Sequence, residues 1–255
     1  MTLGLSLYQQ LSENNLVIPY LENAFNSDQW PDEIKIPMKQ KDYSQNDWFF
    51  PSSHAVPDAR WLYYQLHPDH RNKVAPRRDT TPAKLSMLLG NFLHSVVQEK
   101  MKILGIVEAR HIEVPLRDEI VHARGRADLI FPCHPQKKKD IVVDIKTTGS
   151  VNYDRLIRPY LSHKLQILCY MKWYEELTGE EMDEGVILVI EAGSPFRTKE
   201  FRVFRDEPAM AKLYDKWNYV RECISLNTPP ETKCCTLNSD TMNKCNAKSM
   251  CLETY

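Results

Sequence analysis

The chain has 255 residues, of which 42% are hydrophobic and 26% are charged, so it is long enough and apolar enough to fold around a sizeable core. This composition excludes a disordered or fibrous protein. The 33 Lys and Arg residues nearly balance the 34 Asp and Glu residues, and the formal net charge of -1 excludes a protein that holds polyanions by bulk charge alone. A basic groove offset by acidic residues elsewhere stays compatible with nucleic acid.

The first 81 residues are predicted to form short helices and loops, and we interpret them as an addition that contacts DNA. Residues 60–84 carry six Lys or Arg against two Asp, and Trp61, Tyr63 and Tyr64 lie among these cations. Aromatic faces interleaved with cations are typical of single-stranded DNA binding, through stacking and phosphate contact. Alternatively, the aromatics belong to the core of an ordinary helix. The DNA-contact candidates from this segment are Arg60, Arg77 and Arg78.

The pattern of residues 82–206 predicts an α/β core, and residues 207–255 are expected to form a closing helix and a cysteine-containing tail. Apolar spacing and the Gly and Pro positions set the element limits. The predicted elements are helix Pro82–Leu104, strands Ala109–Leu116, Val121–Phe131 and Asp140–Thr147, helix Asn152–Thr178, strands Gly185–Ile190 and Glu200–Arg205, and helix Pro208–Leu226. This order predicts a mixed central sheet flanked by helices.

Two predicted neighbouring strands carry carboxylates. Side chains alternate across a strand, so Asp144 and Lys146 share one face while Ile145 points to the other. Asp128, in Gly125-Arg126-Ala127-Asp128, stands where the preceding strand turns from polar to apolar. Two carboxylates on one sheet edge suit Mg²⁺ or Mn²⁺, although an ordinary surface hairpin with a salt bridge is the alternative.

Polar residues on two predicted helices extend this pattern. His94 lies on the first helix of the core, where a histidine is usually a packed residue. Gln166 and Tyr170 are four residues apart on the long helix and therefore neighbours on one face. That face is either a solvated surface or one that reaches a substrate. Lys164 precedes it on the same helix as a candidate DNA contact.

Taken in order, GNFLH (90–94), GRAD (125–128), DIK (144–146) and QILCY (166–170) resemble the motifs of the PD-(D/E)xK nucleases of the RecB type. That group includes CRISPR-adaptation exonucleases, phage exonucleases and a mitochondrial genome-maintenance exonuclease. The resemblance covers residues 90–206 and implies a restriction-endonuclease-like core with helical N- and C-terminal additions.

The resemblance also implies a role for each matched residue. It makes His94, Asp128 and Asp144 metal ligands, together with the backbone carbonyl of Ile145. It makes Lys146 the residue that positions the attacking water and stabilises the developing charge. It makes Gln166 and Tyr170 DNA contacts. Two acids close to these motifs in sequence, Glu108 and Glu113, could join the site, but the sequence does not place them.

Many relatives in that family carry a four-cysteine iron–sulfur cluster, with one Cys before the core and three after it, spaced C-x2-C-x5-C. Cys245 and Cys251 match the x5 spacing, but position 242 is Met and the first Cys of the chain is Cys133. Cys234, Cys235, Cys245 and Cys251 are therefore candidates for a local Zn²⁺ site or a rearranged cluster, and the alternative is a tail of free thiols.

The expected function is metal-dependent hydrolysis of DNA, as an exonuclease on single-stranded ends in recombination, repair or phage DNA processing. The alternatives are a structure-specific or nicking endonuclease, and a non-catalytic DNA-binding partner in recombination. Recombination or replication proteins are the expected protein partners.

The sequence also suggests where the protein is found. No run approaches the ~18–20 apolar residues that a membrane-spanning helix needs. The N-terminal segment has no basic region of the secretory type. Seven cysteines, four of them in the last 22 positions, do not form a secreted disulfide framework. We therefore expect a reducing compartment: the cytoplasm, a host cytoplasm if the protein is viral, or an organellar matrix.

Overall fold

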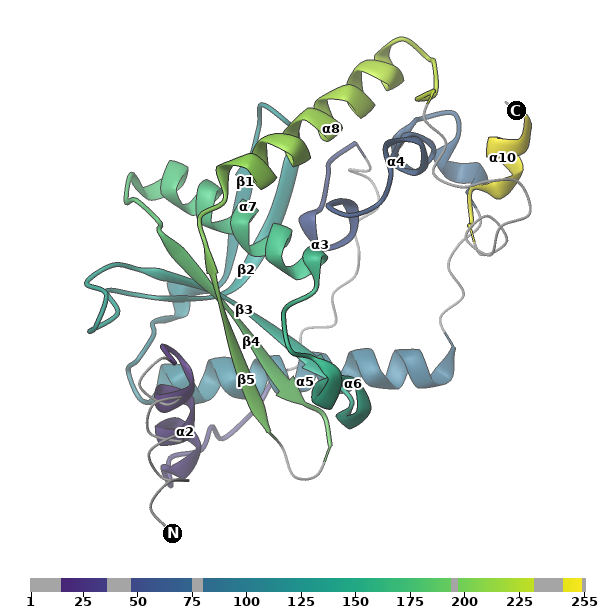
Figure 1. The fold of residues 1–255 in the computed structure, drawn as a ribbon. Helices are drawn as coiled ribbons and strands as arrows, with labels where there is room; N and C mark the ends of the chain where they lie inside the picture. Colours follow the sequence, from purple (N-terminus) through teal and green to yellow (C-terminus); the bar gives the residue numbers. More distant parts are fainter. Residues whose placement is uncertain (1–14, 36–46, 75–79, 194–196, 232–244, 254–255) are drawn as a thin grey trace. The chain divides into compact units, whose positions relative to one another are not determined.

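The computed structural model describes residues 15–35, 47–74, 80–193, 197–231 and 245–253 (Figure 1). The chain divides into two compact units. The first contains the described residues of Met1–Lys39, Thr81–Leu116 and Gly125–Arg205, and the second contains those of Gln40–Thr80, Arg117–Arg124 and Asp206–Tyr255.

The first unit is built on a five-stranded sheet in the order β1-β2-β3-β4-β5. The strands are β1 Ile112–Asp118, β2 Ala123–Phe131, β3 Ile141–Thr148, β4 Glu184–Glu191 and β5 Thr198–Phe204. β2 pairs antiparallel with β3, β3 parallel with β4, and β4 antiparallel with β5. The predicted α/β class, with a mixed sheet flanked by helices, is confirmed, and the order of its elements is that expected of a restriction-endonuclease-like core.

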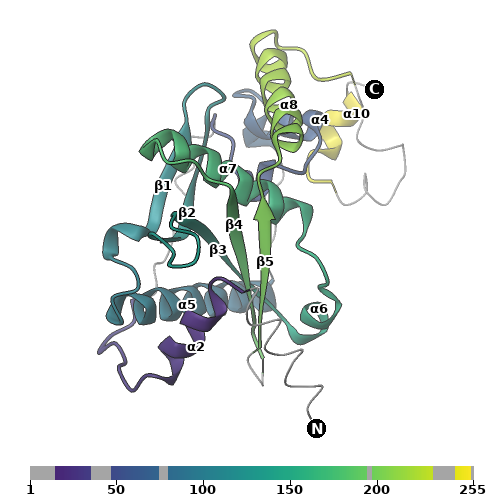
Figure 2. The same ribbon diagram turned by 60° about the vertical axis from the view of Figure 1, so that its left-hand side comes forward.

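Helices cover both faces of this sheet (Figures 1 and 2). On one face, α2 (Ile18–Asn26) and α5 (Thr81–Ile103) pack on alternate strand residues, including Val143, Ile145 and Leu188. On the other face, α7 (Leu161–Thr178) packs so closely on Gly185 that a Cβ there would lie 2.8 Å from Ile167 Cγ1. Because β3 and β4 are central and covered on both sides, they tolerate nearly continuous apolar sequence.

One expectation about the helices was wrong. The predicted helix Asn152–Thr178 is two helices, α6 (Ser150–Arg155) and α7, because Pro159 cannot continue a helix and restricts the residue before it. The apolar stripe of α5 is not buried throughout. Val97 is 2% exposed, whereas Leu85 and Leu88 nearer the start of the helix are 61% and 47% exposed.

The second unit is mainly helical. Its elements are α3 (Pro51–His54), α4 (Ala59–Leu66), the short 3-10 helix η2 (Arg71–Lys73), α8 (Glu207–Ser225) and α10 (Lys248–Glu253), with the adjoining ends of β1 and β2. Tyr63 and Tyr64 are each 1% exposed and form a core cluster with Cys223 and Met250. The alternative interpretation of these aromatics, as core residues, therefore applies to both tyrosines.

In the parts of the chain that the structure describes, the helices are all too short or too polar to span a membrane.

Candidate active site

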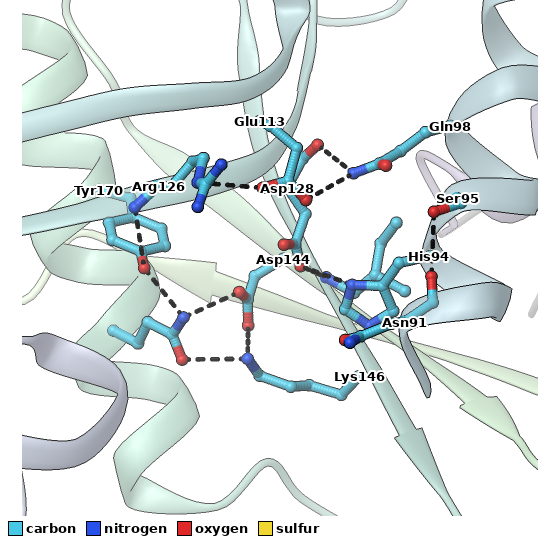
Figure 3. Close-up of polar contacts among 12 residues, drawn as sticks. Asn91, His94, Ser95, Gln98, Glu113, Arg126, Asp128, Asp144, Lys146 and Tyr170 are labelled. Carbon is cyan, nitrogen blue, oxygen red and sulfur yellow. Dashed lines mark hydrogen bonds and ion pairs between the residues drawn. The ribbon is translucent and has the colours of Figure 1, made fainter. Parts of the chain in front are cut away.

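The site lies where β2 and β3 stop pairing. The hydrogen-bonded ladder between them ends at Leu129 opposite Val143, so Asp128 and Asp144 are the next two positions along it. At this point the backbone N–H of Ile145 donates to Asp128 Oδ2 (2.8 Å) instead of continuing the ladder. The side chain of one strand thus replaces a backbone acceptor, which brings both carboxylates to one opening in the sheet (Figure 3).

Asp144, Lys146 and Gln166 form a connected polar group. Asp144 and Lys146 lie on the same face of β3, and Lys146 Nζ is 2.8 Å from Asp144 Oδ2. Gln166, on α7, accepts from Lys146 Nζ through Oε1 (3.0 Å) and donates from Nε2 to Asp144 Oδ1 (3.1 Å). Asp144 is 1% exposed and Gln166 is 5% exposed, so the contacts are made in a dry environment where electrostatic interactions are strong.

Tyr170 joins this group from the next turn of α7. Its hydroxyl oxygen accepts from Gln166 Nε2 (3.1 Å) and from the backbone N–H of Arg126 (3.4 Å). Gly125 lies against its ring, and a Cβ there would be 2.5 Å from Tyr170 Cε1. The glycine of GRAD is therefore the residue that lets β2 approach the tyrosine of QILCY.

The two carboxylates titrate differently although they are neighbours. Burial raises the pKa of Asp144 to about 6, and the opposing charge of Lys146 only partly offsets this. Burial also acts on Asp128, but the hydrogen bond and charge of His94, the charge of Lys146 and the N–H of Ile145 outweigh it and lower the pKa. Environments that separate the pKa values of paired acids are typical of catalytic sites.

Lys146 and Tyr170 keep their protons at neutral pH. Burial disfavours the ammonium of Lys146, but the charges of Asp144 and Asp128 and the contact with Asp144 outweigh burial and raise the pKa. Burial and the charge of Asp144 raise the pKa of Tyr170. Lys146 is accordingly a fixed positive charge next to two carboxylates.

His94 reaches the site from α5, the helix on the opposite face of the sheet. Its Nδ1 lies 3.5 Å from Asp128 Oδ2, and its side chain is 20% exposed. This contact joins a residue of α5 to a carboxylate of β2.

Three further side chains extend the site beyond the predicted set. Gln98, one turn after His94, donates from Nε2 to Asp128 O (2.8 Å) and to Glu113 Oε1 (3.3 Å). Glu113 Oε2 lies 3.1 Å from Arg126 Nε. The i, i+4 spacing from His94 could have identified Gln98, whereas nothing in the sequence placed Glu113. Glu108 instead pairs with Arg110 (3.2 Å).

The DNA-contact candidates are dispersed. Gln166 and Tyr170 are buried within the site itself, and Lys164 is half-buried on α7. In the second unit, Arg60 is 4% exposed and donates to Pro230 O and to Cys251 Sγ (3.3 Å). The DNA contact predicted for Arg60 has no support from this position. Arg77 and Arg78 lie outside the described residues.

The C-terminal cysteines are only partly covered by the structure, since Cys234 and Cys235 lie outside the described residues. Cys251 is 7% exposed in the core cluster of the second unit, and Cys245 is partly buried against the same cluster. Within the described ranges, no group of three or more His, Cys, Asp and Glu side chains is arranged to hold a metal ion.

The donors around Asp128 and Asp144 nevertheless suit a hard divalent cation. Asp144 Oδ2 is buried and lies 2.8 Å from the Lys146 ammonium, so the site holds a carboxylate oxygen of the type that Mg²⁺ or Mn²⁺ prefers. Asp128 and the backbone of Ile145 border the same opening. The chemistry of this donor set fits the metal that the sequence resemblance implies.

No protein-family model matches the chain, and no curated protein matches it in sequence. Among solved structures, it is similar to a protein of Eubacterium rectale that is provisionally named an exonuclease, with a TM-score of 0.49 and 11% identity over 80% of this chain and 94% of that chain. An alkaline exonuclease of Laribacter hongkongensis gives a TM-score of 0.47 and 14% identity over 72% and 91% of the two chains. Similarities this distant carry no weight for function, so the functional proposal rests on the site.

Proposed function

We propose that this protein is a metal-dependent deoxyribonuclease that hydrolyses phosphodiester bonds, as an exonuclease acting on single-stranded ends. The observation that supports this is the meeting of Asp128, Asp144 and Lys146 in one buried opening, with His94 beside them. Burying two carboxylates this close is unfavourable unless a cation offsets them. Such a pair of carboxylates is expected where a protein binds a metal cation.

His94, Asp128, Asp144 and the carbonyl of Ile145 are the residues that would hold Mg²⁺ or Mn²⁺. A cation bound by them would supply charge stabilisation at the phosphoryl oxygens and an activated water. The imidazole of His94 makes Mn²⁺ as acceptable as Mg²⁺. Iron–sulfur or zinc binding by the C-terminal cysteines is not part of this proposal.

Lys146 would stabilise the negative charge that develops on the phosphoryl group. Its raised pKa keeps it protonated, so it serves as a positioned cation and not as a general base. Gln166 and Tyr170 act as positioning residues, because Gln166 holds Asp144 and Lys146 and Tyr170 in turn accepts a hydrogen bond from Gln166. Removing either should alter the rate more than the affinity for DNA.

A single strand has a suitable path next to the site, on the segment that joins α6 to α7. Ile157 and Tyr160 are 86% and 53% exposed there, and Arg155 and Arg158 are also exposed. The Tyr160 ring packs edge-on against His163, whose pKa is lowered to about 4 by burial and by the nearby charge of Lys146. Exposed aromatic and cationic side chains this near the lysine suit stacked bases and phosphates. We therefore assign to this segment the single-strand stacking that the sequence predicted for Tyr63 and Tyr64.

The deciding experiment follows end-labelled linear single strands, linear duplexes and circular single strands over time, with Mg²⁺ or Mn²⁺. An exonuclease degrades the linear strands and spares the circle, whereas cleavage of the circle would indicate an endonuclease. We expect Lys146→Ala to lower the rate at least about 100-fold. Lys172→Ala, which removes a side chain of α7 that is 39% exposed and pairs with Glu176, should leave the rate unchanged. DNA binding without hydrolysis by the parent protein would instead support a non-catalytic partner in recombination or repair.

A further inference from the structure

The ion pair between Glu113 on β1 and Arg126 on β2 borders the catalytic opening (Figure 3). Arg126 Nε lies 3.1 Å from Glu113 Oε2. The arginine side chain is 49% exposed and the glutamate side chain only 19% exposed. The pair therefore joins a carboxylate that is largely enclosed to a guanidinium that reaches solvent.

Glu113 is anchored independently of this arginine. Gln98 Nε2 donates both to Glu113 Oε1 (3.3 Å) and to the backbone oxygen of Asp128 (2.8 Å), which ties the glutamate to the strand that carries a proposed metal ligand. If Arg126 leaves, the carboxylate keeps this donor. Glu113 is thus the fixed member of the pair and Arg126 the mobile one.

The backbone at Glu113 is also unusual. Its φ is 53°, in the left-handed region that residues with side chains rarely adopt. A half-exposed ion pair stabilises a fold little, so the pair does not by itself account for retaining this conformation. Strained residues of this kind cluster at binding and catalytic sites.

Arg126 is well placed to meet a phosphate. It lies two residues before Asp128 on β2, so the two side chains leave the same face of the strand. A guanidinium on a long flexible stem pairs well with phosphate oxygens and can exchange one anion for another without movement of the backbone.

We propose that Arg126 binds a phosphate of the DNA strand next to the scissile one, and that Glu113 holds Arg126 by competing for it until DNA binds. The inference rests on the proposed nuclease function. It assigns the two residues opposite effects on affinity. Arg126 attracts the strand, while Glu113 both occupies the arginine and repels the phosphate.

The test measures binding of a short fluorescein-labelled single-stranded oligonucleotide by anisotropy, with EDTA present, over a range of salt concentrations. We expect Arg126→Gln to weaken binding about tenfold at low salt and to reduce the salt slope by about 0.7, the share of one phosphate on a single strand. Glu113→Gln keeps the side-chain shape and the acceptor for Gln98, and it should bind about threefold more tightly. The double variant should bind slightly more tightly than Arg126→Gln, because only the repulsion by Glu113 is left to remove, and the gain should be smaller than in the parent background.

A matched pair supplies the control. Glu108 and Arg110 form an ion pair of the same type at 3.2 Å, with side chains that are 68% and 73% exposed. Glu108→Gln and Arg110→Gln should leave the affinity unchanged. Arg126→Lys, which keeps the charge and loses the planar fork, should restore part of the affinity and of the salt slope.

Two kinds of result overturn the inference. Equal weakening by Glu113→Gln and Arg126→Gln would mean that the pair only supports the local structure, and unchanged binding in both would mean that Arg126 does not meet DNA. Either result can occur in a protein whose parent form degrades DNA, so the nuclease proposal would survive it. A parent that neither binds nor degrades DNA would overturn both proposals.

Discussion

Gly125 packs against Tyr170 so tightly that Gly125→Ala tests how the two motifs fit together. A Cβ at this position would lie 2.5 Å from Tyr170 Cε1 and 2.7 Å from its hydroxyl oxygen. Atoms at such distances must move apart. The ring has little freedom to do so, since Tyr170 is 3% exposed and its hydroxyl accepts from Gln166 and from the N–H of Arg126.

The expected loss of stability is about 1–2 kcal/mol. Inserting a methyl group into a packed interior costs about 1–3 kcal/mol, whereas alanine in place of glycine within a strand gains about 0.5–1 kcal/mol when there is room. In a Tyr170→Ala background the clash is gone, so Gly125→Ala should there be neutral or slightly stabilising. The coupling between the two positions is therefore about 2–3 kcal/mol, from the same two magnitudes.

Urea denaturation of the parent, the two single variants and the double variant measures this coupling. Gly149→Ala is the control, because a Cβ there meets nothing within 4 Å, and its effect should stay below about 1 kcal/mol. The packing argument would be refuted if Gly125→Ala and Tyr170→Ala were additive within about 0.5 kcal/mol.

Three further predictions concern charge and substrate. The pKa of Asp144 in the folded chain, about 6, lies above its ordinary value of 3.8, so the native state holds this proton more tightly than the unfolded chain and loses stability as the pH rises between those values. In urea titrations with EDTA, the free energy of unfolding of Asp144→Asn should therefore equal that of the parent at about pH 4 and exceed it by up to about 3 kcal/mol above about pH 7. A difference between the two proteins that does not change with pH would contradict the assignment. Nuclease activity should disappear after dialysis against EDTA and return with Mg²⁺ or Mn²⁺, so full activity in chelator would exclude the metal-dependent mechanism. Tyr160→Ala should weaken single-strand binding by about 1–3 kcal/mol per lost stacking contact. Tyr219→Ala, on α8, is the control, and equal affinities of the two variants for single strands would argue against a stacking role of Tyr160.

Local patterns in the sequence predicted much of the core correctly. Strand alternation placed Asp144 and Lys146 together, and the structure finds them 2.8 Å apart. Helical spacing placed Gln166 beside Tyr170, where the structure shows a hydrogen bond. These relations hold within one strand or one helix, so backbone geometry alone determines them. The break at Pro159 follows from an equally local rule that the predicted helix overlooked.

Burial was the less predictable property. The pattern of aromatic and basic residues around Arg60 and Tyr63 predicts a nucleic-acid-binding surface, yet both side chains are buried in the second unit. Leu85 and Leu88 lie on the apolar face of α5, yet they are 61% and 47% exposed. Amphipathic periodicity shows which residues share a face but not what that face meets, because the partner comes from a distant part of the chain.

The sequence by itself determined the order of the elements and the face on which each candidate residue lies, because both depend on short-range geometry. Only the tertiary structure decided where β2 and β3 separate, which brings Asp128 to the N–H of Ile145 and within reach of His94. It also decided that Glu113 and Arg126 border the opening. These contacts join residues of separate strands and helices through the packing of a shared sheet, so the spacing of residues along the sequence does not predict them.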